Sequence, residues 1–243
     1  MKKRRWFSLF LSFALLLPLF SLTSADAYED FTLDAKAGLL IEADTGEILY
    51  EKNAHQENFP ASLTKVMVAL LVFEAIDEGK IALTDSVTAT ESAFEGLSSD
   101  GSTANIVPGE TMTVEQLLNC MLIVSANEAC NILGETLCGS VDAFVARMNE
   151  RAAELGCEHT HFANATGLHN SQHYTTAWDL YLITREALKH DKFMEICNSK
   201  SYTVPATNMT DKPRELHSTN FLISNWRARG YVYRDAQGIK TGS

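Results

Sequence analysis

The sequence predicts an α+β fold, an antiparallel sheet with strands from both ends of the chain, flanked by a cluster of helices. Two strand-like segments joined by a tight turn come first, helical patterns occupy residues 62–189, and short strand-like segments return from residue 201. Strands at both chain ends with helices between them are typical of a sheet whose edge strands come from segments far apart in the sequence.

The first 27 residues predict a secretory signal peptide. Basic residues at 2–5 precede an apolar segment at 6–22, and Ala25-Asp26-Ala27 supplies a small-x-small cleavage pattern. Because the apolar segment is short for a membrane span, an uncleaved anchor is the weaker interpretation. We expect cleavage after Ala27, export from the cytoplasm, and one domain over residues 28–243.

Composition excludes several classes of function. Cleavage changes the formal net charge from −11 to about −14, and without a basic patch we expect no binding to nucleic acid. The seven histidines form no His-Glu-x-x-His motif, which argues against a metal-dependent peptidase, so we expect neither a metal nor a cofactor. Five cysteines are an odd number, their spacing fits no zinc site, and we expect no essential disulfide; they are Cys120, Cys130, Cys138, Cys157 and Cys197.

The first two strands are predicted at residues 37–43 and 47–52. They flank Asp44-Thr45-Gly46, which is typical of a tight turn between antiparallel strands. Further along, residues 96–107 are rich in Ser and Gly and show no periodicity, which indicates a loop.

A buried helix is predicted from about residue 62 to residue 78. Pro60 suits a helix start and Gly79 a helix stop, and the run between them is too long for a strand. Because residues 66–73 are apolar on every helical face, we expect this helix in the core with other elements around it.

Ser62 and Lys65 lie in the first turn of that helix. Three residues apart, they share a face, so the amine can reach the hydroxyl and act as the base that activates it. A Ser-x-x-Lys occurs by chance roughly once in a chain of this length. Alone, the pair is better explained as a surface serine that caps a helix, with a solvated lysine one turn on.

Four more helices follow. Thr113 and Gln116 form a capping box at the start of the first, which should break near Ser125-Ala126-Asn127. The helix resumes over 128–137, and periodic apolar residues predict another at 141–155. Thr176-Ala177-Trp178-Asp179 starts one more, which reaches about residue 189. Short strands are then predicted at 202–204, 217–223, 230–233 and 238–243.

The sequence contains two further motifs in addition to the Ser62 and Lys65 pair. Ser125-Ala126-Asn127 falls at a helix break, where both polar side chains can face a cleft, although an ordinary polar helix junction looks the same. A rival Ser-x-Asn at residues 218–220 lies in a predicted strand, so we favour the first. Lys240-Thr241-Gly242 falls on a late strand-like segment and alone is typical of a turn. The three motifs in this order mark penicillin-binding proteins and class A β-lactamases.

Over almost the whole mature sequence the chain resembles the D-alanyl-D-alanine carboxypeptidases, low-molecular-mass penicillin-binding proteins of the serine peptidase kind. Besides the three motifs, four stretches resemble that family: Pro60-Ala61-Ser62-Leu63-Thr64-Lys65, Asn164-Ala165-Thr166-Gly167-Leu168, His173-Tyr174-Thr175-Thr176-Ala177 and His217-Ser218-Thr219-Asn220. The resemblance implies a β-lactamase/transpeptidase-like fold and removal of the terminal D-alanine from peptidoglycan stem peptides through an acyl-enzyme. It also implies action at the cell wall or at the outer face of the cytoplasmic membrane, with β-lactams as covalent inhibitors.

The resemblance assigns a role to each motif residue. Ser62 is the nucleophile, Lys65 its base, and Ser125 relays a proton to the leaving amine. Asn127 holds a substrate amide, and Lys240-Thr241-Gly242 binds the substrate's terminal carboxylate. The backbone N–H groups of Ser62 and Ser243 hold the developing oxyanion.

The chain departs from the family pattern in two ways, and alternatives stay open. Ala126 replaces a more usual Gly, and the sequence stops at Ser243, so we expect a truncated fold that lacks C-terminal strands and any membrane anchor. A catalytically impaired penicillin-binding module is one alternative. A class A β-lactamase is another, but residues 159–185 contain no Glu to activate the deacylating water.

Overall fold

The computed structural model describes residues 33–242, so the predicted signal peptide and Ser243 lie outside the described residues. The chain divides into two units. The first, Met1–Ala35, contributes only residues 33–35, which hold no helix or strand, and all the elements below belong to the second, Lys36–Ser243. Within the described residues, no helix has the length and apolar character needed to cross a membrane.

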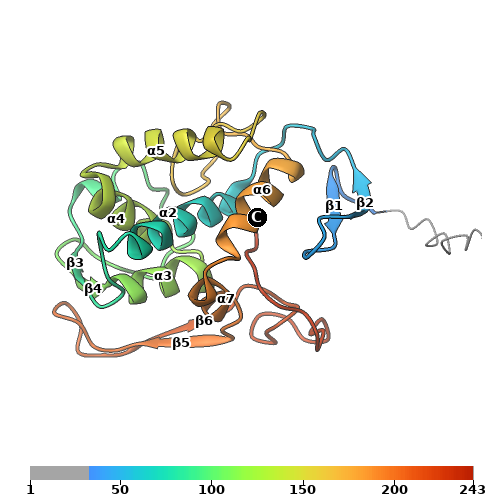
Figure 1. Cartoon of the computed structure of the whole chain (residues 1–243). Helices are drawn as coiled ribbons and strands as arrows, with labels where there is room; N and C mark the ends of the chain where they lie inside the picture. The colour runs from blue at the N-terminus through green and yellow to red at the C-terminus, as the bar shows by residue number, and fades with distance from the viewer. Residues whose placement is uncertain (1–32, 243) are drawn as a thin grey trace, which may run out of the picture. The chain divides into compact units, whose positions relative to one another are not determined.

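Helix α2 (Lys65–Asp77) is the centre of the second unit, and a short 3₁₀-helix at Ala61–Thr64 precedes it. Every residue from Val66 to Phe73 is buried, so this part of the helix has no solvent face, as its sequence predicts. Gly79, with φ +69°, follows its end. Figure 1 shows α2 among the other helices, whose bounds are α3 (Val114–Ile123), α4 (Asn127–Cys138), α5 (Val141–Glu154), α6 (Ala177–Ala187) and α7 (Asp191–Cys197).

The helix boundaries follow the signals in the sequence. Thr113 caps α3 by accepting from the Gln116 N–H, and the Gln116 side chain accepts from the Thr113 N–H, which confirms the capping box. Gly139 ends α4 in the left-handed region, and Thr176 caps α6 through the Asp179 N–H. Helix α7, seven residues long, was not predicted, because so short a segment carries too little periodicity.

The strands form three separate antiparallel pairs among the described residues. The predicted N-terminal hairpin is confirmed, and the Glu42 carboxylate fixes its turn by accepting from the Thr45 N–H and hydroxyl, both at 2.6 Å. The β3–β4 pair, which frames the start of α3, was missed. The pairs are β1 (Gly38–Ile41) with β2 (Ile48–Lys52), β3 (Ser86–Thr88) with β4 (Thr111–Thr113), and β5 (Ser201–Val204) with β6 (Arg214–His217).

Most of the late strand predictions are wrong. The prediction at 202–204 is confirmed by β5, but β6 ends at His217, and residues 218–223, 230–233 and 238–242 form no strand. Local hydrogen bonds explain the first of these segments. The Asn220 N–H donates to Ser218 Oγ and the Leu222 N–H to Asn220 Oδ1, so short polar side chains hold turns in place of a strand ladder. The predicted pairing of strands from both chain ends is not made within 33–242.

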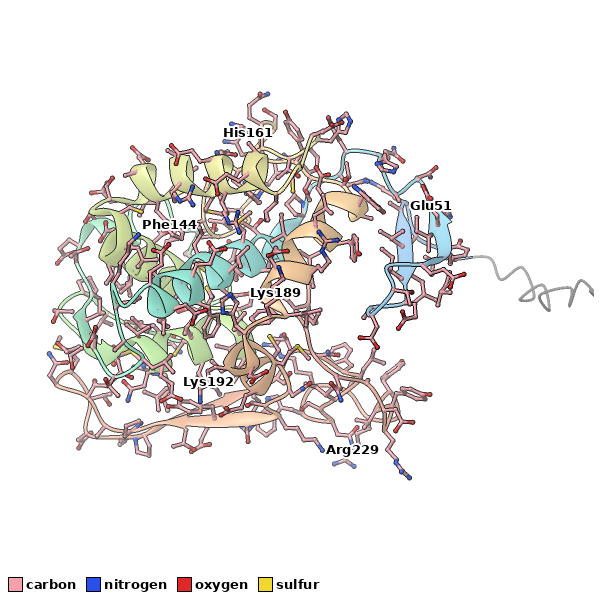
Figure 2. The ribbon with its side chains drawn as sticks, in the orientation of Figure 1. Glu51, Phe144, His161, Lys189, Lys192 and Arg229 are labelled. Atoms are coloured by element: carbon pink, nitrogen blue, oxygen red, sulfur yellow. The ribbon has the colours of Figure 1, made fainter. Side chains whose placement is uncertain are left out.

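Helices α4 and α5 pack closely because Gly134 has no side chain. Phe144, labelled in Figure 2, projects from α5 and is fully buried against Gly134. A Cβ built on Gly134 would lie 2.7 Å from Phe144 Cδ1, which is inside van der Waals contact. The glycine therefore sets how closely these two helices approach.

We expect Gly134→Ala to lower the free energy of unfolding by about 1–2 kcal/mol, since overpacking outweighs the gain in helix propensity. Urea denaturation measures it. In a Phe144→Ala background the same change should cost little, because the ring atoms that it meets are gone. Equal losses in both backgrounds would contradict this account of the packing.

Candidate functional site

A cleft of about 470 Å³ brings together residues from four distant parts of the sequence. Three of the predicted site residues, Ser62, Ser125 and Thr241, line it with their hydroxyl-bearing side chains, and Gly242 borders it. The complete lining is Ser62, Ser102, Ser125, Thr219, Asn220, Phe221, Leu222, Arg227, Tyr231, Thr241 and Gly242. The cleft therefore offers many hydrogen-bonding groups between apolar walls.

Ser62 sits in the 3₁₀-helix that leads into α2. A 3₁₀-helix has three residues per turn, so residues three apart eclipse each other, and Lys65 stands directly over Ser62. The distance from Lys65 Nζ to Ser62 Oγ is 3.0 Å. The predicted contact between amine and hydroxyl is present.

Lys65 is 0% exposed although it carries an amine. Its Nζ also donates to Asn127 Oδ1 at 2.9 Å and to the Thr166 carbonyl at 2.6 Å. Burial lowers its pKa, and the nearby Cys130 and Glu128 oppose that shift. A neutral amine has two N–H groups and one lone pair. A neutral Lys65 that gives both N–H groups to the two carbonyl oxygens would turn its lone pair to the Ser62 hydroxyl, whereas an ammonium would donate to all three oxygens.

The Thr166 carbonyl is held in place by a loop that Asn164 organises. Asn164 Oδ1 accepts from the Thr166 and Gly167 N–H groups, and Asn164 Nδ2 donates to the Leu168 carbonyl. Residues 164–168 resemble the family, but the sequence did not predict a place for them in the site. Sequence spacing could not reveal the contact between Thr166 and Lys65, because the two residues are about a hundred positions apart in the chain.

The predicted helix break at Ser125-Ala126-Asn127 is confirmed between α3 and α4. Ser125 adopts φ +67°, and its Oγ is buried with no hydrogen-bond partner among the described residues. The loop opposite comes so near that a Cβ on Gly101 would lie 2.7 Å from Asn127 Nδ2. An unpartnered hydroxyl at a cleft wall is available to a ligand.

The Lys240-Thr241-Gly242 segment lies against the start of the Ser62 helix. A Cβ on Gly242 would be 3.2 Å from both the Pro60 carbonyl oxygen and Leu63 Cγ, so the backbones are close. Thr241 Oγ1 is 2.7 Å from Thr219 Oγ1. Lys240 Nζ donates to the Thr241 carbonyl at 2.8 Å, and Lys240 is not among the cleft-lining residues. Burial, followed by the neighbouring Lys65, lowers the Lys240 pKa to about 8.

Several cleft residues were missed. Thr219 and Asn220 belong to the rival Ser-x-Asn, which lies after β6 and not within a strand. Arg227 is the one charged side chain in the described cleft lining, and Tyr231 stands with it on a loop without periodicity. No pattern in the sequence marks that loop as part of a site.

No cysteine is among the described residues that line this cleft. All five cysteines are free thiols, and burial raises the pKa of Cys120, Cys157 and Cys197 to about 12 and that of Cys130 to about 11. Thiols with such pKa values form little thiolate at neutral pH. Among residues 33–242 no group of three His, Cys, Asp or Glu side chains could hold a metal ion.

Solved structures resemble this chain in fold as well as in sequence. The DD-transpeptidase of Streptomyces K15 superposes with a TM-score of 0.78 at 29% identity, covering 89% of this chain and 82% of that one. Penicillin binding protein 5 of Haemophilus influenzae gives a TM-score of 0.73 at 29% identity, over 81% and 55% of the two chains. The predicted transpeptidase-like fold is thereby confirmed.

Curated relatives point the same way. D-alanyl-D-alanine carboxypeptidase DacF of Bacillus subtilis is 39% identical over 209 residues, which are 86% of this chain and 51% of the relative. DacA of Escherichia coli is 33% identical over 215 residues, 86% and 50% of the two chains. The chain thus spans about half the length of these relatives. A family model described as D-alanyl-D-alanine carboxypeptidase matches residues 23–243, and the chain belongs to that family.

Proposed function

We propose that this protein is a serine-type D-Ala-D-Ala carboxypeptidase that removes the terminal D-alanine from peptidoglycan stem peptides. The observation that carries the proposal is the fully buried Lys65 amine 3.0 Å from the Ser62 hydroxyl at a hydroxyl-lined cleft. Relatives of similar sequence are named for this activity. An exported enzyme at the cell wall or at the outer face of the cytoplasmic membrane would meet such a substrate.

In the acylation step, Ser62 Oγ attacks the carbonyl carbon of the penultimate D-alanine while Lys65 Nζ takes its proton. Ser125, whose hydroxyl is otherwise unpartnered, relays that proton from Lys65 to the nitrogen of the departing D-alanine as the C–N bond breaks, and keeps its own hydroxyl. The Ser62 N–H is one donor to the oxyanion, and the Ser243 N–H, outside the described residues, is proposed as the other. Water then releases the shortened peptide and restores the Ser62 hydroxyl.

Substrate binding uses the other motif residues. Asn127 Oδ1 is occupied by Lys65, which leaves Asn127 Nδ2 to hold a substrate amide. Thr241 offers its hydroxyl to the terminal carboxylate. Lys240 adds a positive charge once its ammonium exchanges the Thr241 carbonyl for that carboxylate. The proposal assigns Gly242 to the same binding strand.

The two alternatives make different predictions. A class A β-lactamase would need a carboxylate to activate water, yet residues 159–185 hold no Glu. The one Asp there, Asp179, already accepts from the His159 N–H and the Thr160 hydroxyl. An impaired penicillin-binding module would be acylated by penicillin without releasing D-alanine from a peptide.

The first prediction concerns the nucleophile. After incubation with penicillin, intact mass should show one stable adduct on the wild type and none on Ser62→Ala. D-alanine release from a diacyl-D-Ala-D-Ala peptide should fall by about 10³-fold or more in the variant. Lys189 is an exposed lysine, and Lys189→Ala is the surface control that should behave as wild type. An adduct that survives in Ser62→Ala would refute the assignment.

The second prediction concerns the fate of that adduct. Residues 159–185 hold no Glu, and Asp179, the one carboxylate there, is buried. The penicilloyl-enzyme should therefore persist for many minutes, and penicillin should act as an inhibitor. Following the adduct mass after removal of free penicillin measures its lifetime. Decay within seconds, with catalytic hydrolysis of penicillin, would favour the β-lactamase alternative.

The third prediction concerns pH. Lys240 holds its ammonium below about pH 8 and loses it above, so KM for a carboxylate-ended peptide should rise above pH 8, by up to about tenfold per unit. Lys240→Arg keeps its charge, so its KM should not rise between pH 8 and 10. A peptide amide lacking the carboxylate is the control and should bind weakly at every pH. A wild-type KM unchanged through pH 10 would exclude Lys240 as the anchor.

A further inference from the structure

The peptide unit between Ala61 and Ser62 determines where the Ser62 N–H points. In a trans peptide the carbonyl and the N–H lie in one plane and face opposite ways, so fixing the Ala61 carbonyl also fixes the Ser62 N–H. Ala61 adopts φ +49°, a left-handed conformation that an alanine rarely takes and that its surroundings must maintain. The contacts of the Ala61 carbonyl therefore bear directly on the proposed oxyanion donor.

A buried chain of hydrogen bonds ends at that carbonyl. Thr64 Oγ1 donates to the Ala61 carbonyl at 2.8 Å, and His173 Nε2 lies 2.7 Å from the same Thr64 oxygen. The hydroxyl has one hydrogen, which goes to the carbonyl, so His173 Nε2 must be the donor to Thr64. Thr64 is 0% and His173 2% exposed.

The other ring nitrogen of His173 requires the same tautomer. His173 Nδ1 accepts from the Ala163 N–H at 3.1 Å, so Nδ1 carries no hydrogen. Burial, with a smaller effect of His161, lowers the His173 pKa to about 4, and the ring is neutral near neutral pH. One neutral tautomer thus satisfies both contacts, and the direction of donation runs from Ala163 through His173 and Thr64 to Ala61.

Gly167, in the loop that Asn164 organises, packs against the same Ala61–Ser62 peptide unit. A Cβ on Gly167 would lie 1.9 Å from the Ala61 carbonyl oxygen and 3.0 Å from the Ser62 nitrogen, so only glycine allows this approach. The peptide unit is confined by Gly167 while the Thr64 hydroxyl sets the direction of its carbonyl. A carbonyl that accepts a hydrogen bond also polarises its own peptide and makes the N–H a better donor.

We propose that His173 and Thr64 are positioning residues that aim the Ser62 N–H at the oxyanion of the acylation transition state. Neither side chain touches the substrate; each acts through the Ala61 carbonyl. This inference rests on the proposed function, because it requires acyl transfer to Ser62. It assigns a role to Thr64 within the Ser-x-x-Lys motif and to the stretch that begins at His173.

Thr64→Val and Thr64→Ser form the decisive pair of variants. Val keeps the shape of Thr but has no hydroxyl, and Ser keeps the hydroxyl. With penicillin and with a diacyl-D-Ala-D-Ala peptide, Thr64→Val should lower the acylation rate constant and kcat by about 10- to 100-fold while KM stays within about twofold. Thr64→Ser should recover most of the loss. Thr136→Val, which removes another hydroxyl that donates to a helix carbonyl, is the matched control and should react at the wild-type rate.

His173→Phe tests the other end of the chain of hydrogen bonds. Phe fills the ring volume without a donor, and the variant should show the same loss in kcat. The double variant with Thr64→Val should be no slower than either single variant, because both act through one hydrogen bond. Where His173→Phe does not fold, as thermal unfolding would show, the Thr64 pair decides alone.

The outcomes separate this inference from the function on which it rests. No adduct on the wild type would overturn the proposed function itself. A wild-type adduct with Thr64→Val reacting at the wild-type rate would overturn the inference alone. The inference would also be overturned if Thr64→Val changed KM and not kcat, or if Thr64→Ser did not restore the lost activity. Either result would indicate a structural role for Thr64 without orientation of the Ser62 N–H.

Discussion

The burial of the Lys65 amine is the constraint on which the rest of the site depends. An ammonium held away from water is costly, and none of the polar contacts of Lys65 in the described residues is to a carboxylate. Burial therefore lowers the Lys65 pKa, against the smaller opposite effects of Cys130 and Glu128. In the neutral amine the two carbonyl oxygens would take both N–H groups and leave the lone pair to Ser62. The position of Lys65 in α2 keeps its amine from water, because this first residue of the helix is as completely buried as the apolar residues in the middle.

Close backbone approaches, more than side-chain bulk, hold the groups around that amine. Gly167 lets one loop touch the Ala61–Ser62 peptide, and Gly101 lets another reach Asn127. Gly242 brings the third motif against the start of the nucleophile helix. At each place a Cβ would enter the space of a neighbouring atom. The cleft is thus assembled from loops whose spacing glycine sets, around a rigid central helix.

Sequence patterns predicted the parts of the structure that local chemistry decides. Helix ends at Thr113, Gly139 and Thr176 carry caps, and the apolar run after Lys65 can be satisfied only in a core. The late strands were a different case. Extended sequence becomes a strand only beside a partner, and around Ser218 and Asn220 side chains bind the backbone in turns instead. The same limit hid the Thr166 carbonyl and Arg227, which reach the site through tertiary contacts that no spacing encodes.

The central claim is that burial lowers the Lys65 pKa, so that more of the amine is neutral and able to act as the base for Ser62 than at an exposed lysine. Selective ¹³C and ¹⁵N labelling of lysine, with Lys65→Arg to assign the signal, allows its amine to be titrated by NMR. We predict a midpoint below that of the exposed lysines, because burial lowers the Lys65 pKa. A Lys65 signal that titrates together with the exposed lysines would contradict the claim and remove the base from the proposed mechanism.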